Sequence, residues 1–431
     1  MHAKAPPPST TSRTGEGEVP QRKTRTAPLP GRDGKPSGAP VAIRKQRKTL
    51  RSDYEGVKPI VMGGMVAQKK RTGTRRSCVS IGKDDVLKRA TIVKPNEAGS
   101  PAPGKLGAAA KRRNQRPKLD AGTIVNSESH AYYIIDLIGA GGFGDVYKVE
   151  QNVTKEIYAL KTEQIPQKGN MPQDRLKVEL CGALQIETTV MSACNKVTDP
   201  EKRRHFVRMV DKGFTDKFKF LVMDLVGPSI DDLRRHVLGT DFSRATATKL
   251  SIETLQGIAC LHHAGFLHRD IKPQNFACSR DPNSPTIYIL DFGIARQYTN
   301  RNSKEVRPAR DYVKFLGTIR YASRSAHRSK EQSRKDDVEQ WIFLTAEMYD
   351  IGNLSWRKNN DRGAVLLEKE KFFQFKSPHI WTSMPATFKQ IMKTTDAMGY
   401  ETEPDYPAIQ ALIELGARES KYDTTLPQYD D

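Results

Sequence analysis

Two short strings at a fixed spacing constrain this sequence more than any other feature. Residues 267–275 read Leu-His-Arg-Asp-Ile-Lys-Pro-Gln-Asn, and Asp291-Phe292-Gly293 begins sixteen positions after the Asn. Either string could arise by chance alone, whereas chance is a poor explanation for both in this order. Between Ser243 and Phe266, apolar residues recur three or four apart, which predicts an amphipathic helix leading into the first string.

Four side chains in these strings have the chemistry of phosphoryl transfer to an alcohol. Asp270 would orient the acceptor hydroxyl and take its proton, and Lys272 would offset charge on the transferred group. Asn275 and Asp291 would hold magnesium. A single Asp in such a place is most often structural, but all four residues in register favour the catalytic interpretation.

A glycine-rich turn lies upstream, where glycines let backbone amides approach phosphates closely. A dinucleotide-binding turn would open directly into a helix. Here another strand-like run follows instead, which favours a mononucleotide triphosphate. The candidate nucleotide-binding residues of the turn are Ile138, Gly139, Ala140, Gly141, Gly142, Phe143, Gly144 and Val146.

The next strand-like run ends in a lysine. Strand geometry puts Ala159 and Lys161 on one face, so Ala159 can pack on adenine while Lys161 reaches the phosphates. A surface lysine is the alternative. Such a lysine needs a carboxylate partner. Glu187, set in an apolar frame, is preferred over Glu179, which lies near the expected helix start and suits a surface residue equally well.

The apolar run 220–226 breaks at a Gly-Pro pair, which predicts the connection between two lobes. Beside Met223, backbone groups of Asp224 and Val226 are candidates to bond the adenine edge. Asp232 is placed for the ribose hydroxyls, with an exposed helix-start carboxylate as the alternative.

The positive charge is concentrated in the first part of the chain. Residues 1–120 hold 28 Lys and Arg against 9 Asp and Glu, or +19 of the total +21. Tyr54 is their only aromatic residue, so this segment cannot bury enough apolar surface to fold and is expected to be disordered. The basic clusters at 44–48 and 111–118 indicate nuclear import or docking to nucleic acid, the microtubule surface or acidic lipid, against a solvated linker as the alternative. No aromatics interleave with the arginines, so base stacking is not supported.

Five dispersed cysteines without a Cys-x-x-Cys spacing indicate reduced thiols instead of a disulfide framework or zinc site. Nothing near the N-terminus resembles a signal peptide, and no apolar run is long enough to span a bilayer. We expect a monomer located in the cytoplasm or the nucleus.

These residues, with the string Leu-Gly-Thr-Ile-Arg-Tyr-Ala-Ser at 316–323, resemble the casein kinase 1 superfamily, which carries this string where most kinases have Ala-Pro-Glu. The likeness covers about Gly122 to about Leu415. Four further segments are most similar to the tau-tubulin kinase branch: 291–300, 306–308, 326–328 and 336–337.

The resemblance implies an α+β, bilobal protein kinase fold with a small β-rich lobe carrying one main helix and a larger helical lobe. The expected organisation is a basic tail, the N-lobe with its hinge, the C-lobe and a short C-terminal tail, at 1–120, 121–226, 227–418 and 419–431. It also implies ATP with Mg²⁺, transfer to Ser or Thr of protein substrates, and no dependence on activation-loop phosphorylation.

Family substrates tend to be acidic or already phosphorylated, and Arg320 resembles the residue of an anion pocket, where a guanidinium binds phosphate bidentately. Asp337 resembles the helix carboxylate that braces the catalytic loop. Ala277 departs from the larger residue that most kinases place under adenine, and Ser355 stands where the family usually has Pro. A scaffold that binds nucleotide without transferring phosphate is the alternative to an active enzyme. Because no catalytic group is lost, the active interpretation is preferred.

Overall fold

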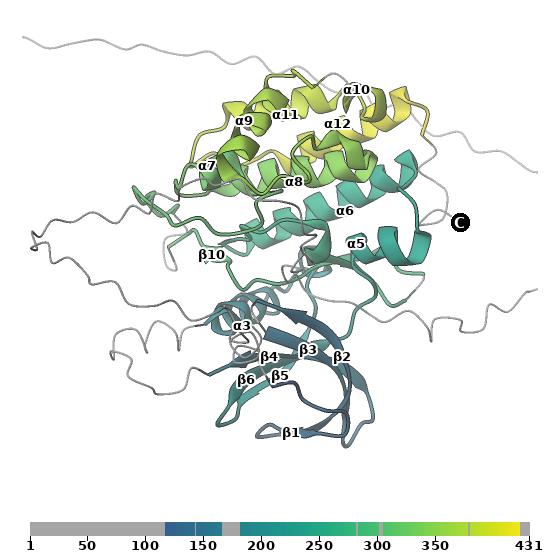
Figure 1. Ribbon diagram of the computed structural model, residues 1–431, viewed down its shortest axis with the longest axis vertical. Coiled ribbons are helices and arrows are strands. Elements are labelled where there is room, and N and C mark those ends of the chain that lie inside the picture. Colours follow the sequence, from purple (N-terminus) through teal and green to yellow (C-terminus); the bar gives the residue numbers. More distant parts are fainter. Residues whose placement is uncertain are drawn as a thin grey trace, which may run out of the picture. The chain divides into compact units, whose positions relative to one another are not determined.

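The computed structural model describes residues 117–142, 144–165, 182–281, 283–300, 305–377 and 380–422. Phe143, Glu179 and most of the basic segment lie outside these ranges. Within them the chain forms an α+β fold of two lobes, one built on a sheet and one on helices (Figure 1). This architecture confirms the expected fold class.

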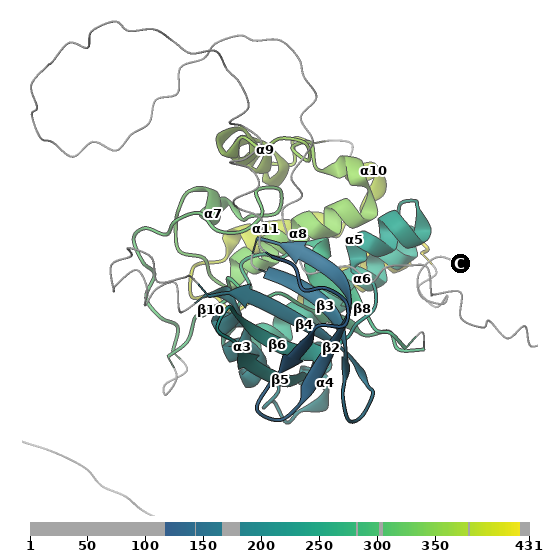
Figure 2. The same ribbon diagram turned by 60° about the horizontal axis from the view of Figure 1, so that its bottom comes forward.

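The smaller lobe is a six-stranded antiparallel sheet in the order β1-β2-β3-β4-β6-β5. Helix α3 (Ala183–Cys194) packs on one face of it (Figure 2). Side chains alternate across β4, so that Ala159 joins the core shared with α3 and its neighbours Tyr158 and Leu160 join a separate core on the opposite face. The strands are β1 Ile124–Asn126, β2 Ala131–Gly141, β3 Gly144–Gln151, β4 Ile157–Gln164, β5 Met209–Phe214 and β6 Phe218–Asp224.

Gly144 opens β3 at the point where the glycine-rich hairpin meets β4. Its φ is +149°, and a Cβ atom there would lie 1.8 Å from the carbonyl oxygen of Thr162. Only glycine therefore allows the two strands to approach at this register.

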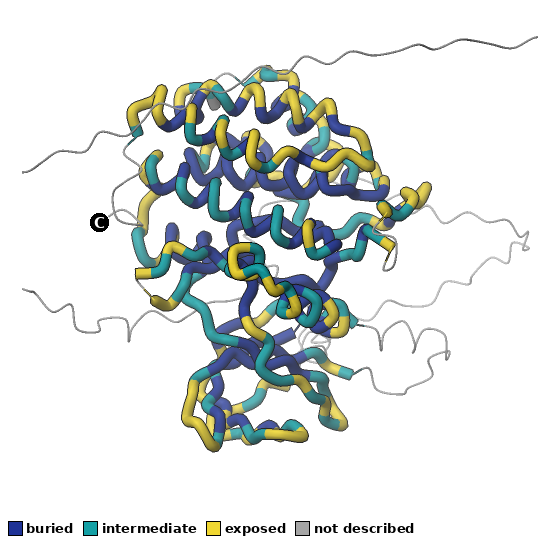
Figure 3. Tube along the Cα trace, turned by 180° about the vertical axis from the view of Figure 1, so that it is seen from behind, coloured by how far each residue is buried: buried dark blue, intermediate teal, exposed yellow. Residues whose placement is uncertain are grey.

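Two long helices organise the larger lobe. Helix α6 (Arg244–His263) confirms the amphipathic helix expected before the first string, and Ser243 caps it by accepting from the Thr246 N–H at 3.1 Å. Helix α8 (Arg334–Tyr349) is buried all round except at Lys335, as befits a central core helix (Figure 3). Short helices surround these two: α4 Pro200–Arg203, α5 Ile230–Asp232, α7 Arg324–His327, α9 Arg362–Phe373, α10 Ile380–Ser383, α11 Phe388–Ala397 and α12 Tyr406–Glu419.

Two short two-stranded antiparallel sheets lie at the junction of the lobes. Strand β7 (Phe266–Leu267) pairs with β10 (Arg296–Gln297), and β8 (Phe276–Cys278) pairs with β9 (Ile287–Ile289). They place the first string directly beside the second. No helix in the described ranges is both long enough and apolar enough to cross a membrane.

Candidate active site

Lys161 lies between two carboxylates that come from distant parts of the chain. Its Nζ is 2.6 Å from Oε2 of Glu187 on α3 and 2.9 Å from Oδ1 of Asp291, which follows β9. All three side chains are almost completely buried. The structure thus pairs Lys161 with Glu187, the preferred partner in the sequence.

Two opposing effects set the pKa values in this cluster: burial disfavours each charged form, and the neighbouring opposite charges favour it. Burial by itself would lower the pKa of Lys161, but the neighbouring charges of Asp291 and Glu187 raise it above its usual value. Burial would raise the pKa of Asp291, yet Lys161 and Lys272 hold it below its usual range. Burial raises the pKa of Glu187 despite the attraction of Lys161. Lys161 and Asp291 are therefore a charged pair at neutral pH.

Asp270 is held by three donors. Its Oδ2 accepts from Lys272 Nζ at 2.6 Å, and its Oδ1 accepts from the backbone N–H and the hydroxyl of Thr318 at 2.9 and 2.8 Å. Lys272 Nζ is also 3.3 Å from Thr318 Oγ1. Thr318 belongs to the string at 316–323, but no sequence pattern indicated its contact with Asp270.

Asp337 of α8 braces the loop that carries Asp270. Its Oδ2 accepts from the His268 N–H at 2.7 Å, and its Oδ1 accepts from the Arg269 N–H at 2.9 Å. His262 of α6 bonds the same carboxylate at 2.8 Å. Arg269 has a φ of +68°, a conformation that a non-glycine residue keeps only when its surroundings impose it.

Asn275 and Asp291 come together through the β8–β9 hairpin. Asn275 immediately precedes β8 and Asp291 follows β9, and the Leu290 N–H donates to the Asn275 carbonyl at 2.9 Å. The Asn275 amide donates to the Asp270 carbonyl at 2.9 Å, while its buried Oδ1 has no hydrogen-bond partner among the described residues. A buried oxygen without a partner beside an ionised carboxylate suits Mg²⁺, which takes oxygen ligands, so the residues present fit that ion.

One of the backbone groups predicted to bond the adenine edge already has a partner within the fold. The Asp224 N–H donates to the Arg208 carbonyl at 3.1 Å, and the Asp224 carboxylate is bound by the Arg208 guanidinium at 2.9 Å. The Asp224 N–H is thus used in pairing with the residues before β5. The role of Asp224 at the adenine edge stays a prediction, with its carbonyl as the candidate group. The predicted roles of Val226 and Met223 stay predictions.

The remaining predicted nucleotide-binding residues lie around the same junction. Ile138, Val146, Ala159, Met223 and Ala277 belong to one buried apolar cluster. Gly139, Ala140 and Gly141 lie in β2, and Gly142 lies in the turn that joins it to β3.

Asp232 is buried at the end of α5 and accepts from Ser229 Oγ at 2.5 Å. The alternative of an exposed carboxylate is thus wrong, since the chain folds back over this turn. Burial raises the pKa of Asp232, although Ser229 opposes that shift.

Arg320 lies in a cluster of arginines around a buried carboxylate, which no sequence pattern indicated. Its Nη1 is 3.3 Å from Oε1 of buried Glu347, and its Nε donates to the Arg357 carbonyl at 3.2 Å. Arg357 contacts the same Glu347 oxygen at 2.8 Å, and Arg234 Nη2 lies 3.7 Å from it. Glu347 on α8 therefore orients these arginines, and only a contact across the folded lobe reveals it.

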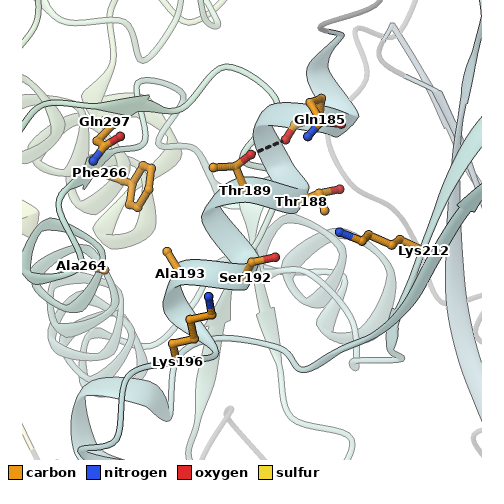
Figure 4. Close-up of a pocket in the computed structure, with 10 residues that line it drawn as sticks. All are labelled: Gln185, Thr188, Thr189, Ser192, Ala193, Lys196, Lys212, Ala264, Phe266 and Gln297. Atoms are coloured by element: carbon orange, nitrogen blue, oxygen red, sulfur yellow. Dashed lines mark hydrogen bonds between the residues drawn. The ribbon is translucent and has the colours of Figure 1, made fainter. Parts of the chain in front are cut away.

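A hollow of about 460 Å³ lies outside this site, between α3, β5 and the paired strands β7 and β10. Figure 4 shows Lys212 extending from β5 toward α3, where Thr188 and Ser192 lie. None of the predicted site residues lines this hollow.

The sequence of this chain is similar to those of known proteins. Residues 132–398 match the model of the protein kinase domain family. The serine/threonine-protein kinase spe-6 of Caenorhabditis elegans is 31% identical over 320 residues, which cover 72% of this chain and 78% of that protein. A C. elegans protein named as a candidate serine/threonine-protein kinase is 35% identical over 238 residues, 55% of this chain and 70% of its own length.

A probable serine/threonine-protein kinase of Dictyostelium discoideum is 32% identical over 294 residues, 68% of this chain. The match spans 54% of the D. discoideum protein, about half its length.

Proposed function

The chain belongs to the protein kinase domain family, among relatives of the serine/threonine class, and from this premise we propose that it transfers the γ-phosphoryl group of ATP to serine or threonine side chains of proteins. The observation that carries the proposal is Lys161 bonded to both Glu187 and Asp291, with Asp270 held in the adjacent loop. A structural ion pair would need only one carboxylate. Because Glu187 and Asp291 share a single lysine, the second carboxylate is suited to bind a metal–nucleotide complex.

Each residue of the site has a proposed role that follows from its position. Lys161 would bind the α and β phosphates of ATP, and Glu187 keeps its ammonium in place. Asp270 would orient the acceptor hydroxyl and accept its proton, since Thr318 fixes one carboxylate oxygen. Lys272 would offset charge on the transferred group. Asn275 and Asp291 would hold magnesium, which when bound neutralises charge on the phosphates.

Incorporation of labelled phosphate from ATP into an acidic protein substrate tests this proposal. Asp270→Asn should abolish the signal, whereas Asp216→Asn, which changes an exposed carboxylate in the β5–β6 turn, should leave it unchanged. Equal incorporation by the native chain and Asp270→Asn would contradict the proposed activity, and a native chain that binds ATP without transfer would be a scaffold.

We further propose that the substrates are acidic or already phosphorylated. Arg234, Arg320 and Arg357 surround Glu347, and Arg234 also contacts Asp231, so three guanidinium groups face two carboxylates. A phosphorylated residue could offset the excess. Arg320→Gln should raise the KM for a phosphorylated peptide and leave that for its unphosphorylated form unchanged; an equal rise for both would contradict the preference.

The strings 291–300 and 316–323 support placement in the casein kinase 1 superfamily, close to its tau-tubulin kinase branch. We propose that the chain works in the cytoplasm or nucleus and that its basic segment, residues 1–120, docks to a polyanion. Binding of the full chain to microtubules or nucleic acid should then weaken steeply with salt, and deletion of residues 1–116 should remove it. Salt-independent binding would contradict this role.

A further inference from the structure

A buried carboxylate lies just ahead of α8 and belongs to none of the sites above. The Glu331 side chain is completely shielded from solvent. Arg310 binds it bidentately, with Nε on one oxygen and Nη2 3.2 Å from the other. Arg296 Nη2 lies 3.3 Å from Oε2. The bidentate geometry favours this contact over a single-bonded surface ion pair, while 47% of the Arg310 side chain stays exposed.

The arginines around Glu331 come from the segments that build the reaction centre. Arg296 lies in β10, on the segment that leaves Asp291. Arg310 lies on the stretch that continues to Thr318, whose backbone N–H and hydroxyl bind Asp270. The carboxylate thus connects Arg296, which follows Asp291, and Arg310, which precedes Thr318, to the residues just ahead of α8.

Arg269, the residue before Asp270, also feels this carboxylate. Burial lowers the pKa of Arg269 to about 10, and the charge of Glu331 is the main effect opposing that shift. The Arg269 Nε donates to the Ile294 carbonyl at 2.9 Å, which ties the catalytic loop to the same segment. Arg296 and Arg310 both act on Arg269 in the unfavourable direction. Three like charges therefore meet here, and they need an anion between them.

Asp337 also favours the charged form of Arg269, but its oxygens accept from the backbone N–H groups of His268 and Arg269 and bond His262. Tyr400 lies close enough to influence Arg296 and Arg310, but its hydroxyl donates to the Arg307 carbonyl at 3.1 Å. Within the described residues, Glu331 is the carboxylate in ion-pair contact with Arg296 and Arg310. Their attraction also lowers the pKa of Glu331 against its burial, so it is ionised at neutral pH.

We propose that Glu331 is a positioning residue, a resident anion that holds residues 291–300 and 305–318 against the catalytic loop. A phosphate added to such a loop can order it by pairing with arginines. Here a carboxylate of the chain already occupies the arginines, so Thr318 can bind Asp270 without phosphate on the segment. This inference rests on the proposed transfer activity.

The first experiment removes the charge and keeps the shape. Glu331→Gln should lower kcat about tenfold or more, because a small displacement of the groups that hold Asp270 is costly in rate, and should leave the KM for ATP unchanged. Hydrogen exchange of residues 305–318 should rise in the same variant. The matched control is Glu403→Gln, which removes an exposed partner of Arg334 and should alter neither readout.

The second experiment supplies the anion from solution. Glu331→Ala leaves a cavity beside the arginines, so sodium acetate should restore part of its kcat relative to sodium chloride at equal ionic strength. Glu331→Gln, whose amide fills the space, should not respond. Lost stability alone would not produce this difference. If Glu331→Ala fails to unfold cooperatively, Arg310→Gln replaces it and should reproduce the rate loss.

Two results would overturn the inference. One is a Glu331→Gln variant with native kcat and native exchange over 305–318. The other is native enzyme that loses its activity when phosphatase removes phosphate from that segment, as checked by mass spectrometry. A native chain that transfers no phosphate would instead refute the proposed function, and the exchange measurement would still decide whether Glu331 orders the segment.

Discussion

Two charge clusters in this protein have opposite arrangements. Around Lys161, one cation lies between two carboxylates. Around Glu331, one carboxylate lies between two arginines, with a third close by. The first has two carboxyl groups for one lysine, which suits a site for metal and nucleotide. The second keeps an excess of positive charge and holds two segments of backbone together.

The comparison shows what burial does to charge. A buried ion is costly unless it is paired and hydrogen-bonded, so each cluster survives only as a complete set. Removing the central group leaves like charges facing one another in both cases. The consequences differ because Lys161 would touch the nucleotide, whereas Glu331 acts through Arg310 and the segment it anchors.

The largest effect is expected from Lys161→Met. It removes the phosphate ligand and leaves Glu187 and Asp291 without their shared cation, so single-turnover transfer of labelled phosphate should fall about 10³-fold. Lys371→Met, on the exposed face of α9, should be neutral. Transfer reduced less than about tenfold would mean that the cluster is only structural.

Asp337→Asn should have the next largest effect, a loss of about 100-fold in kcat. The carboxylate accepts from two backbone N–H groups and from His262, and an amide cannot accept from all three while keeping the strained Arg269 in place. Steady-state kinetics should show little change in the KM for ATP. Asp241→Asn, an exposed change, serves as the control, and a fall in KM alone would contradict the brace.

His205 is buried without an ion-pair partner among the described residues, so it shows how burial alone acts on a titratable group. Its effect should be visible in the pH dependence of stability. Burial lowers the pKa of His205 to about 4, and its Nδ1 lies 2.8 Å from the Ile287 carbonyl. The folded pKa is below the unfolded value near 6.5, so the unfolded chain binds the proton first and stability falls as pH drops through this window. Lowering pH from 7 to 5 should cost about 2 kcal/mol through this group.

Urea unfolding of the native chain and His205→Gln at both pH values measures that contribution. The variant should lose less stability between pH 7 and pH 5 than the native chain. Equal losses would mean that His205 keeps an ordinary pKa in the folded state.

Thr318→Val should give the smallest effect, about tenfold in kcat, because it removes one hydroxyl donor from Asp270 while the backbone N–H remains. Thr318→Ser keeps the hydroxyl and should restore most of the rate. A valine variant with native kcat would show that the backbone bond alone orients Asp270.

Much of the site could be predicted from local patterns. The strings around Asp270 and Asp291 have fixed chemistry at fixed spacing, and the apolar frame of Glu187 indicated a buried ion pair that the structure contains. The α+β fold and membership of the protein kinase domain family agree with those strings. Placement in a particular branch stays a prediction.

Other parts could not be predicted in this way. The sequence does not indicate which carbonyl a given N–H group will pair with, so the bond between the Asp224 N–H and the Arg208 carbonyl could not be predicted. Glu331 and Glu347 look like ordinary acidic residues in the sequence. Their arginine partners lie between ten and more than one hundred positions away, where no short pattern connects them.

The sequence by itself determined which chemical groups this protein carries: its lysine, its two aspartates, its asparagine and the glycine that lets β3 approach β4 at 144. These depend on residue type and short spacing, which local geometry fixes. Only the tertiary structure decided which charges share a buried space. Burial makes that choice, because inside the fold each charge must find partners, and the folded chain brings those partners from distant segments.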